Sequence, residues 1–137
     1  MNAPTFDSVQ VGDELPALAL SAVDRTTLAL FAGASGDHNP IHIDIDFARK
    51  AGMPDVFAHG MLGMAWVSRM VTGWAPQAQM RCYDVRFAGI THLGNVIRCS
   101  GKVVEKLEAE RCVRVEVQSA NQYGQTKIAG DVLVVLP

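Results

Sequence analysis

The second half of the chain alternates between apolar and polar residues with a period of two. The alternation runs through segments 83–87, 96–107, 111–119 and 126–136. This period is typical of β-strands that have one buried face and one solvated face. Short polar breaks between the last three segments suit hairpin turns. The pattern predicts an antiparallel meander of about four strands, and we expect a fifth strand near residues 14–22.

The first half carries turn signals and helical patterns instead. Asp24 is a candidate N-cap for a helix over 25–34, because Asp side chains accept hydrogen bonds from the free N–H groups of a first helical turn. Asp44 or Asp46 is a candidate cap for a shorter helix that ends near residue 51.

The segment 59–74 has the helical pattern that most constrains the fold. Arg69 is its one charged residue. A helix that is apolar on nearly every side should be buried on nearly every side, and this one is too short to span a membrane. The sequence therefore predicts one antiparallel sheet curled around one long helix.

Composition narrows the class of protein further. The chain has 137 residues, of which 49% are hydrophobic and 19% charged, with a formal net charge of −2. These values predict one folded domain over residues 1–137 and exclude an intrinsically disordered chain. Because there is no basic run and no long apolar run, we expect neither nucleic acid nor a membrane as the partner.

The cysteines and the first residues bear on location. Three cysteines without CxxC spacing favour reduced thiols that pack as small apolar residues, as in the cytoplasm. The segment 1–7 has no basic start followed by an apolar stretch, so we expect no signal peptide.

The densest polar cluster lies between the predicted helices, at residues 33–44. Pro40 keeps Asn39 out of the α region, so this segment is ordered irregular chain. Three interpretations are open from the residues alone. The first is a plain turn in which Asp and Asn side chains bind the nearby backbone. The second is acid–base catalysis by an Asp/His pair five positions apart.

The third interpretation is a metal site. His42, Asp44 and Asp46 alternate along the chain and could share one face. The two acids are also candidate helix caps, and no second histidine has ligand spacing to them, so we expect no metal here.

The loop motif resembles a known family. Segment 35–42 reads Ser-Gly-Asp-His-Asn-Pro-Ile-His and resembles the signature of the R-specific enoyl-CoA hydratases, or MaoC-like dehydratases. Segments 58–62, 11–13 and 83–87 resemble further family features, so the resemblance spans nearly the whole chain. The chain is also similar in pattern to the catalytic subunit of (3R)-hydroxyacyl-carrier-protein dehydratases. The implied fold is the α+β hot dog, a curved antiparallel sheet of about five strands around one long central helix.

The resemblance carries over residue by residue. It implies that Asp37 and His42 are the catalytic pair, with one water between them. Asn39 matches a supporting polar residue of the loop, and Ser68 matches a serine near the pair. The backbone N–H of Gly60 matches the donor to the thioester carbonyl.

The implied activity is that of a hydro-lyase of fatty acid metabolism. It reversibly hydrates trans-2-enoyl thioesters of coenzyme A or acyl-carrier protein to (3R)-3-hydroxyacyl thioesters, without a metal or redox cofactor. This chemistry needs a base, an acid and a donor to the enolate oxygen, which the matched residues supply.

Two alternatives differ in activity or assembly. A hot-dog thioesterase would hydrolyse the thioester, and one subunit of a heteromeric dehydratase would need a second hot-dog chain to form its acyl pocket. We expect a homodimer, because one sheet around one helix leaves sheet edges and an apolar face uncovered.

Overall fold

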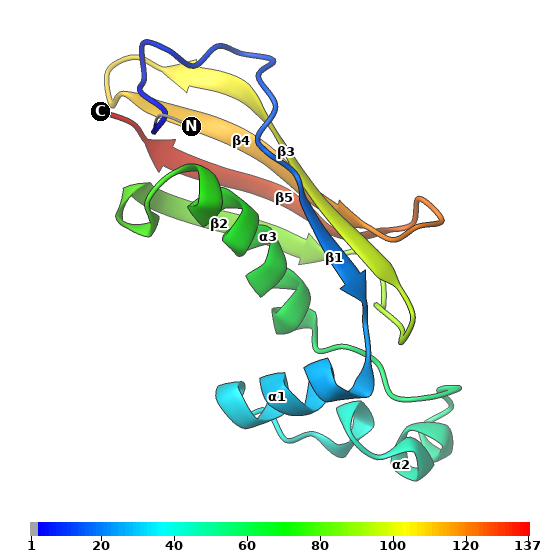
Figure 1. Ribbon diagram of the computed structural model, residues 1–137. Coiled ribbons are helices and arrows are strands. Elements are labelled where there is room, and N and C mark those ends of the chain that lie inside the picture. Colours follow the sequence, from blue (N-terminus) through cyan, green and yellow to red (C-terminus); the bar gives the residue numbers. More distant parts are fainter. Residues whose placement is uncertain (1–2) are drawn as a thin grey trace.

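The computed structural model describes residues 3–137. Residues 1 and 2, on which the expectation about a signal peptide partly rests, lie outside the described residues. A five-stranded antiparallel sheet has the order β1-β3-β4-β5-β2, and helix α3 lies across one of its faces (Figure 1). The strands are β1 (Leu18–Ala22), β2 (Met80–Phe87), β3 (Val96–Leu107), β4 (Cys112–Ala120) and β5 (Thr126–Val135). The helices are α1 (Arg25–Ser35), α2 (Ile45–Lys50) and α3 (Gly60–Trp74), with two short 3₁₀ turns, Pro40–His42 and Gln77–Gln79.

The meander prediction is correct for β3, β4 and β5 and wrong for β2. Strand β2 pairs with β5, in a register that places Val85 opposite Gly130. A Cβ at Gly130 would collide with the carbonyl oxygen of Asp84, so glycine is what allows this close approach. The alternation identifies a strand and its buried face, but the long connection after β2 decides which edge of the sheet the strand joins.

Helix α3 packs its inner side on the sheet. Its buried residues are Leu62, Gly63, Val67, Met70 and Val71. The outer side is open, and Met61 is 57% exposed. The expectation that the chain buries this helix on nearly every side is therefore wrong. The sheet covers one side only, and the apolar outer side remains in solvent.

Helices α1 and α2 lie beyond the end of the sheet (Figure 1). The prediction that Asp24 caps the first helix is confirmed, since its side chain accepts a hydrogen bond from Thr27 N at 2.8 Å. Asp44 caps α2 in the same way and accepts from the backbone N–H groups of Asp46 and Phe47. The Asp44 cap fixes the end of the polar loop that leads into α2, and Gly36 caps the end of α1 where the loop begins.

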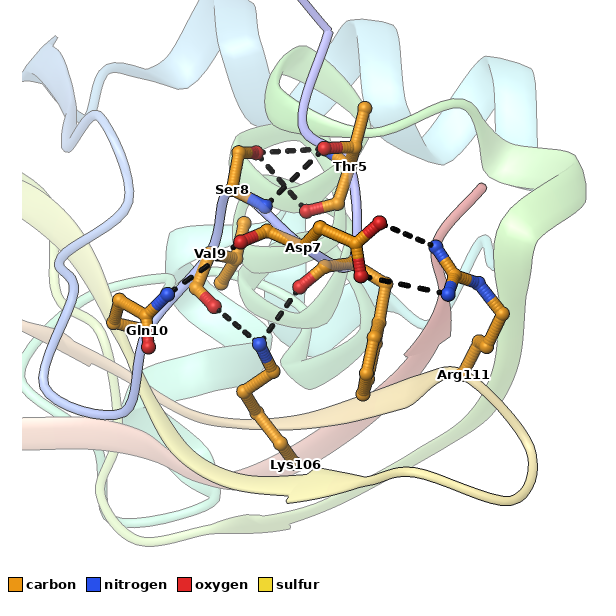
Figure 2. A network of polar contacts seen from close by, with 8 residues as sticks. Thr5, Asp7, Ser8, Val9, Gln10, Lys106 and Arg111 are labelled. Atoms are coloured by element: carbon orange, nitrogen blue, oxygen red, sulfur yellow. Dashed lines mark hydrogen bonds and ion pairs between the residues drawn. The ribbon is translucent and has the colours of Figure 1, made fainter.

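The N-terminal segment is fastened to the other end of the sheet. Lys106 Nζ donates to the carbonyl oxygens of Phe6 and Val9, both at 2.7 Å, and lies 4.4 Å from the centre of the Phe6 ring. Arg111 forms an ion pair with Asp7 nearby (Figure 2). We call the contacts of Lys106 with Phe6 and Val9 the N-terminal clamp.

The cysteines are free thiols. Cys99 and Cys112 are buried as expected, whereas Cys82 is exposed on β2, so the prediction that it packs inside is wrong. None of the helices in residues 3–137 is both long and apolar enough to cross a membrane.

Candidate active site

The loop after α1 is built from local hydrogen bonds. Gly36 ends the helix with φ 75°, a left-handed conformation that glycine adopts without strain. Asp37 Oδ1 accepts from Asn39 N at 3.2 Å, and Asn39 Oδ1 accepts from Ile41 N at 3.1 Å. The exposed Asp37 and Asn39 side chains thus shape the turn that leads to His42. The plain-turn interpretation describes these contacts correctly, but it does not account for the surroundings of His42.

His42 is buried, with 9% of its surface exposed. Its Nδ1 lies 2.7 Å from the carbonyl oxygen of Phe57, and the Phe57 ring packs edge-on against it. A carbonyl oxygen only accepts, so Nδ1 carries the hydrogen and Nε2 keeps its lone pair in the neutral ring. Nε2 of His42 is therefore available to accept a hydrogen bond from a water molecule.

A second histidine completes the cluster. Donor and acceptor atoms of Asp37, His42 and His59 all lie within 4.8 Å of one another. The His59 ring stacks on that of His42, with centroids 3.9 Å apart and planes at 28°. Its Nε2 lies 3.2 Å from the Asp37 carbonyl oxygen.

Burial controls the charge of His59. Its ring is 2% exposed, and burial lowers its pKa below the ordinary value near 6.5. The hydrogen bond to the Asp37 carbonyl raises the pKa but is weaker than burial. The nearby His42 lowers the pKa further, and the charge of the Asp37 carboxylate raises it by a smaller amount. His59 is therefore a neutral ring beside the predicted catalytic pair.

The geometry of this cluster suits proton transfer better than metal binding. Lone pairs of imidazole nitrogens lie in the ring plane, and the near-parallel planes of His42 and His59 keep their lone pairs from converging on one ion. Among the described residues, His42, Asp44 and Asp46 do not bring their ligand atoms together as a group, and Asp44 serves as the cap of α2.

Gly60 opens α3 beside this cluster. The first N–H groups of a helix have no partner within it, and the helix dipole makes this end positive. Gly60 borders a cavity of about 280 Å³, whose lining also includes His59, Gly63, Phe87, Lys127 and Ile128. A Cβ at Gly60 would lie 3.2 Å from the Phe87 ring, so glycine keeps this entrance open. A carbonyl oxygen placed here would meet backbone donors.

Ser68 lies two helical turns after Gly60. Its hydroxyl donates to the Ala65 carbonyl oxygen at 2.9 Å, a common contact within helices. It lines a different cavity, of about 560 Å³, together with Met61, Met64, Met80 and Tyr83. The structure thus brings Asp37, His42 and Gly60 near one another and places Ser68 further along α3. The functional roles of the predicted site residues stay predictions; these residues are Asp37, Asn39, His42, Gly60 and Ser68.

Sequence reasoning missed three features of this site. His59 lies outside the motif at 35–42 and has no role in the prediction, although its position directly before Gly60 is a signal. The Phe57 carbonyl that orients His42 is a backbone group, which the residue type does not reveal. Lys127 lines the cavity, and burial lowers its pKa. It comes from β5, 67 residues after Gly60, and no motif marks it.

Comparisons with known proteins agree with this geometry. A family model described as a MaoC like domain matches residues 8–123. The chain is 23% identical to an (R)-specific enoyl-CoA hydratase of Rhodospirillum rubrum, over 96% of this chain and 91% of the relative. Two further curated relatives are much longer proteins, of which the chain spans 6% and 25%.

Solved structures show the same architecture. The R-hydratase PhaJ1 from Pseudomonas aeruginosa superposes with a TM-score of 0.84 at 28% identity, covering 97% of this chain and 85% of the other. A chain of the ChsH1-ChsH2 complex from Mycobacterium tuberculosis superposes with a TM-score of 0.83 at 26% identity, covering 93% and 98%. The fold is therefore the expected hot dog.

Proposed function

The chain belongs to the MaoC-like domain family, and we propose that it reversibly adds water to trans-2-enoyl thioesters to give (3R)-3-hydroxyacyl thioesters. The observation that carries this proposal is the cluster of the Asp37 carboxylate and the His42 imidazole, which lie within 4.8 Å of each other and of His59, a residue that lines the Gly60 cavity. A hydratase relative that aligns with nearly the whole chain supports the same reaction.

In the proposed mechanism, one water lies between Asp37 and His42. The carboxylate takes one proton from this water, while Nε2 of His42 orients it. The water oxygen forms a bond to Cβ of the enoyl group as the Cα–Cβ double bond becomes single. Negative charge then develops on the thioester oxygen, where the N–H of Gly60 and the positive end of α3 stabilise it. The proton taken from the water is then passed from the Asp37/His42 pair to Cα, which completes the addition of one water molecule and returns both residues to their starting protonation states.

The substrate handle and the cofactor requirement are also part of the proposal. Acid–base groups and backbone donors suffice for this reaction, so we propose that it uses no metal or redox cofactor. The acyl group is carried as a thioester of coenzyme A or of acyl-carrier protein, and these two handles share the pantetheine arm that would enter beside Gly60.

The test is the loss of enoyl-thioester ultraviolet absorbance on crotonyl-CoA and on a longer enoyl-CoA, with Asp37→Asn beside the natural protein. Fast loss that disappears in the variant is the expected result. No loss with either coenzyme A thioester, followed by turnover of the same acyl groups on carrier protein, would identify the handle as the carrier. Free thiol release would instead make the protein a thioesterase, and failure on both handles would refute hydration by this chain alone.

We further propose that two copies of this chain pair through the outer side of α3 and strand β2. Strand β2 is an edge of the sheet, Phe87 near its end is 56% exposed, and Met61 on α3 is equally open. An apolar helix side next to an unpaired edge favours association, because pairing covers both.

Size determination by light scattering distinguishes a homodimer of this chain from an assembly that needs a second hot-dog chain. A homodimer is the expected result. An active monomer would refute pairing, and a monomer that becomes active only with a second hot-dog chain would favour a heteromer like the one named for the ChsH1-ChsH2 structure. We also place the protein in the cytoplasm because its three thiols are free, which cell fractionation would test.

A further inference from the structure

His59 touches both halves of the predicted catalytic pair. Its Nε2 lies 3.2 Å from the carbonyl oxygen of Asp37, and its ring stacks on that of His42 at 3.9 Å between centroids. Phe31 packs edge-on against the same ring, with centroids 4.9 Å apart. The residue that follows is Gly60. One side chain thus connects Asp37, His42 and the start of α3.

The hydrogen-bonding state of His59 is unusual for a residue that only fills space. Because the Asp37 carbonyl accepts, Nε2 carries the hydrogen and Nδ1 keeps a lone pair. This Nδ1 is buried and has no hydrogen-bond partner among residues 3–137. Although His59 occupies the N-cap position of α3, its side chain makes no capping bond. Burying an unpaired polar atom costs stability, so an apolar ring would suit a purely structural role better.

We propose that His59 is a positioning residue that holds the Asp37 backbone with its N–H and the plane of the His42 ring with its face. Held in this way, Nδ1–H of His42 stays on the Phe57 carbonyl, and Nε2 remains free to orient the water from which Asp37 takes a proton. This inference rests on the proposed hydratase function, in which Asp37 and His42 act on one water.

Three substitutions separate the two contacts. His59→Gln keeps an amide N–H at the ε position and loses the ring, His59→Phe keeps a ring and loses the N–H, and His59→Ala loses both. We expect kcat to fall roughly 10- to 100-fold in His59→Ala, with KM little changed, because misplacement of the pair affects turnover more than binding. The Gln and Phe variants should each recover part of that loss.

Val56→Ala is the matched control for lost packing. Val56 is buried in the same connecting segment, so its truncation should lower the melting temperature without lowering kcat. If kcat of His59→Ala falls no further than kcat of Val56→Ala, or if neither Gln nor Phe restores any activity, the positioning role is refuted.

A second measurement does not depend on turnover. Ring nitrogen chemical shifts of His42 report which nitrogen carries the hydrogen. We expect the Nδ1–H form in the natural protein and a mixture of both forms in His59→Ala. An unchanged single form in His59→Ala would overturn the proposal even if the protein is an active hydratase. Absence of hydration in the natural protein would refute the function, whereas the His42 shifts would still decide the role of His59.

Discussion

Asp37 Oδ1 accepts a hydrogen bond from the backbone N–H of Asn39 over 3.2 Å, so one oxygen of the predicted base also shapes the loop that carries it. Asp37→Asn retains a carbonyl oxygen at that position and should keep the turn. It removes the charge, and we expect kcat to fall roughly 10²- to 10⁴-fold with an unchanged melting temperature. Enoyl-CoA absorbance and thermal melts measure the two effects. Asp44→Asn is the control, because asparagine caps a helix as well as aspartate does, and equal loss in both variants would contradict the role of Asp37.

Asparagine can also supply the hydrogen-bond donor of His42 without its basic nitrogen. The amide nitrogen of His42→Asn sits at the δ position, where it can still donate to the Phe57 carbonyl, but the variant lacks the basic Nε2. We expect a fall in kcat of roughly 10²- to 10⁴-fold with the loop intact. His42→Ala should in addition lose about 1–3 kcal/mol of unfolding free energy in urea melts, because the half-buried Phe57 carbonyl is left without its donor.

A matched change in the same loop checks this assignment. His38 is exposed, and His38→Asn should leave both kcat and stability unchanged. Full activity in His42→Asn would remove His42 from the mechanism.

Two glycines of α3 offer a paired test of the cavity. Gly63 lines the Gly60 cavity, and a Cβ there would lie 3.4 Å from Ile128, a contact that the site can accept. Gly63→Ala should stabilise the helix by about 0.5–1 kcal/mol and, by filling space for substrate, lower kcat/KM roughly 10-fold. Gly73→Ala, which meets nothing within 4 Å, should stabilise equally without affecting turnover. If Gly63→Ala retains full kcat/KM on short and long substrates, the thioester binds elsewhere.

The N-terminal clamp should affect stability alone. Lys106→Met removes two hydrogen bonds from a charged donor to the Phe6 and Val9 carbonyls, at the end of the sheet away from α1 and α2 (Figures 1 and 2). We expect a loss of about 2 kcal/mol in the free energy of unfolding and no change in kcat. Lys102→Met, on the exposed side of the same strand, should cost much less. A matching loss of kcat in Lys106→Met would indicate coupling between the two ends of the fold.

Acid should destabilise the protein through His59. Burial lowers the pKa of His59 in the fold, so between that pKa and about 6.5 the unfolded chain binds a proton that the folded chain does not. The contribution of the neutral His59 to the stability of the fold is therefore fully present above about pH 6.5 and decreases as the pH falls below that value. Melting temperatures from about pH 8 to 5 should show this decline in the natural protein and a smaller one in His59→Gln.

Carboxylates affect the stability of the fold in a separate, more acidic pH range. Hydrogen bonds from Thr27 and Arg25 hold the pKa values of Asp24 and Asp55 below the ordinary 3.8. The contribution of these two carboxylates to stability is present above that value and is lost only as the pH falls through the folded-state pKa.

Identical pH profiles for the natural protein and His59→Gln would contradict the neutral, buried state of His59.

Local order could be predicted from the sequence because it depends on near neighbours. The period-two alternation of residues 113–118 identified β4, and the Asp24 side chain reaches a backbone N–H only three residues away. The motif at 35–42 brought Asp37 and His42 into one loop, whose turns are closed by hydrogen bonds between residues two positions apart. Contacts of this range depend only on residues that lie close together in the sequence.

The tertiary structure alone decided the contacts that span longer stretches of chain. Phe57 lies 15 residues after His42, and His59 lies 22 residues after Asp37, so both meet the loop only after the connection into α3 has folded. The pairing of β2 with β5 likewise follows from the path of the chain, since a period of two is the same for every neighbour. The sequence by itself therefore determined the elements and the acid–base loop. Only the folded chain determined what orients His42 and which side of α3 stays open, because these depend on packing between distant segments.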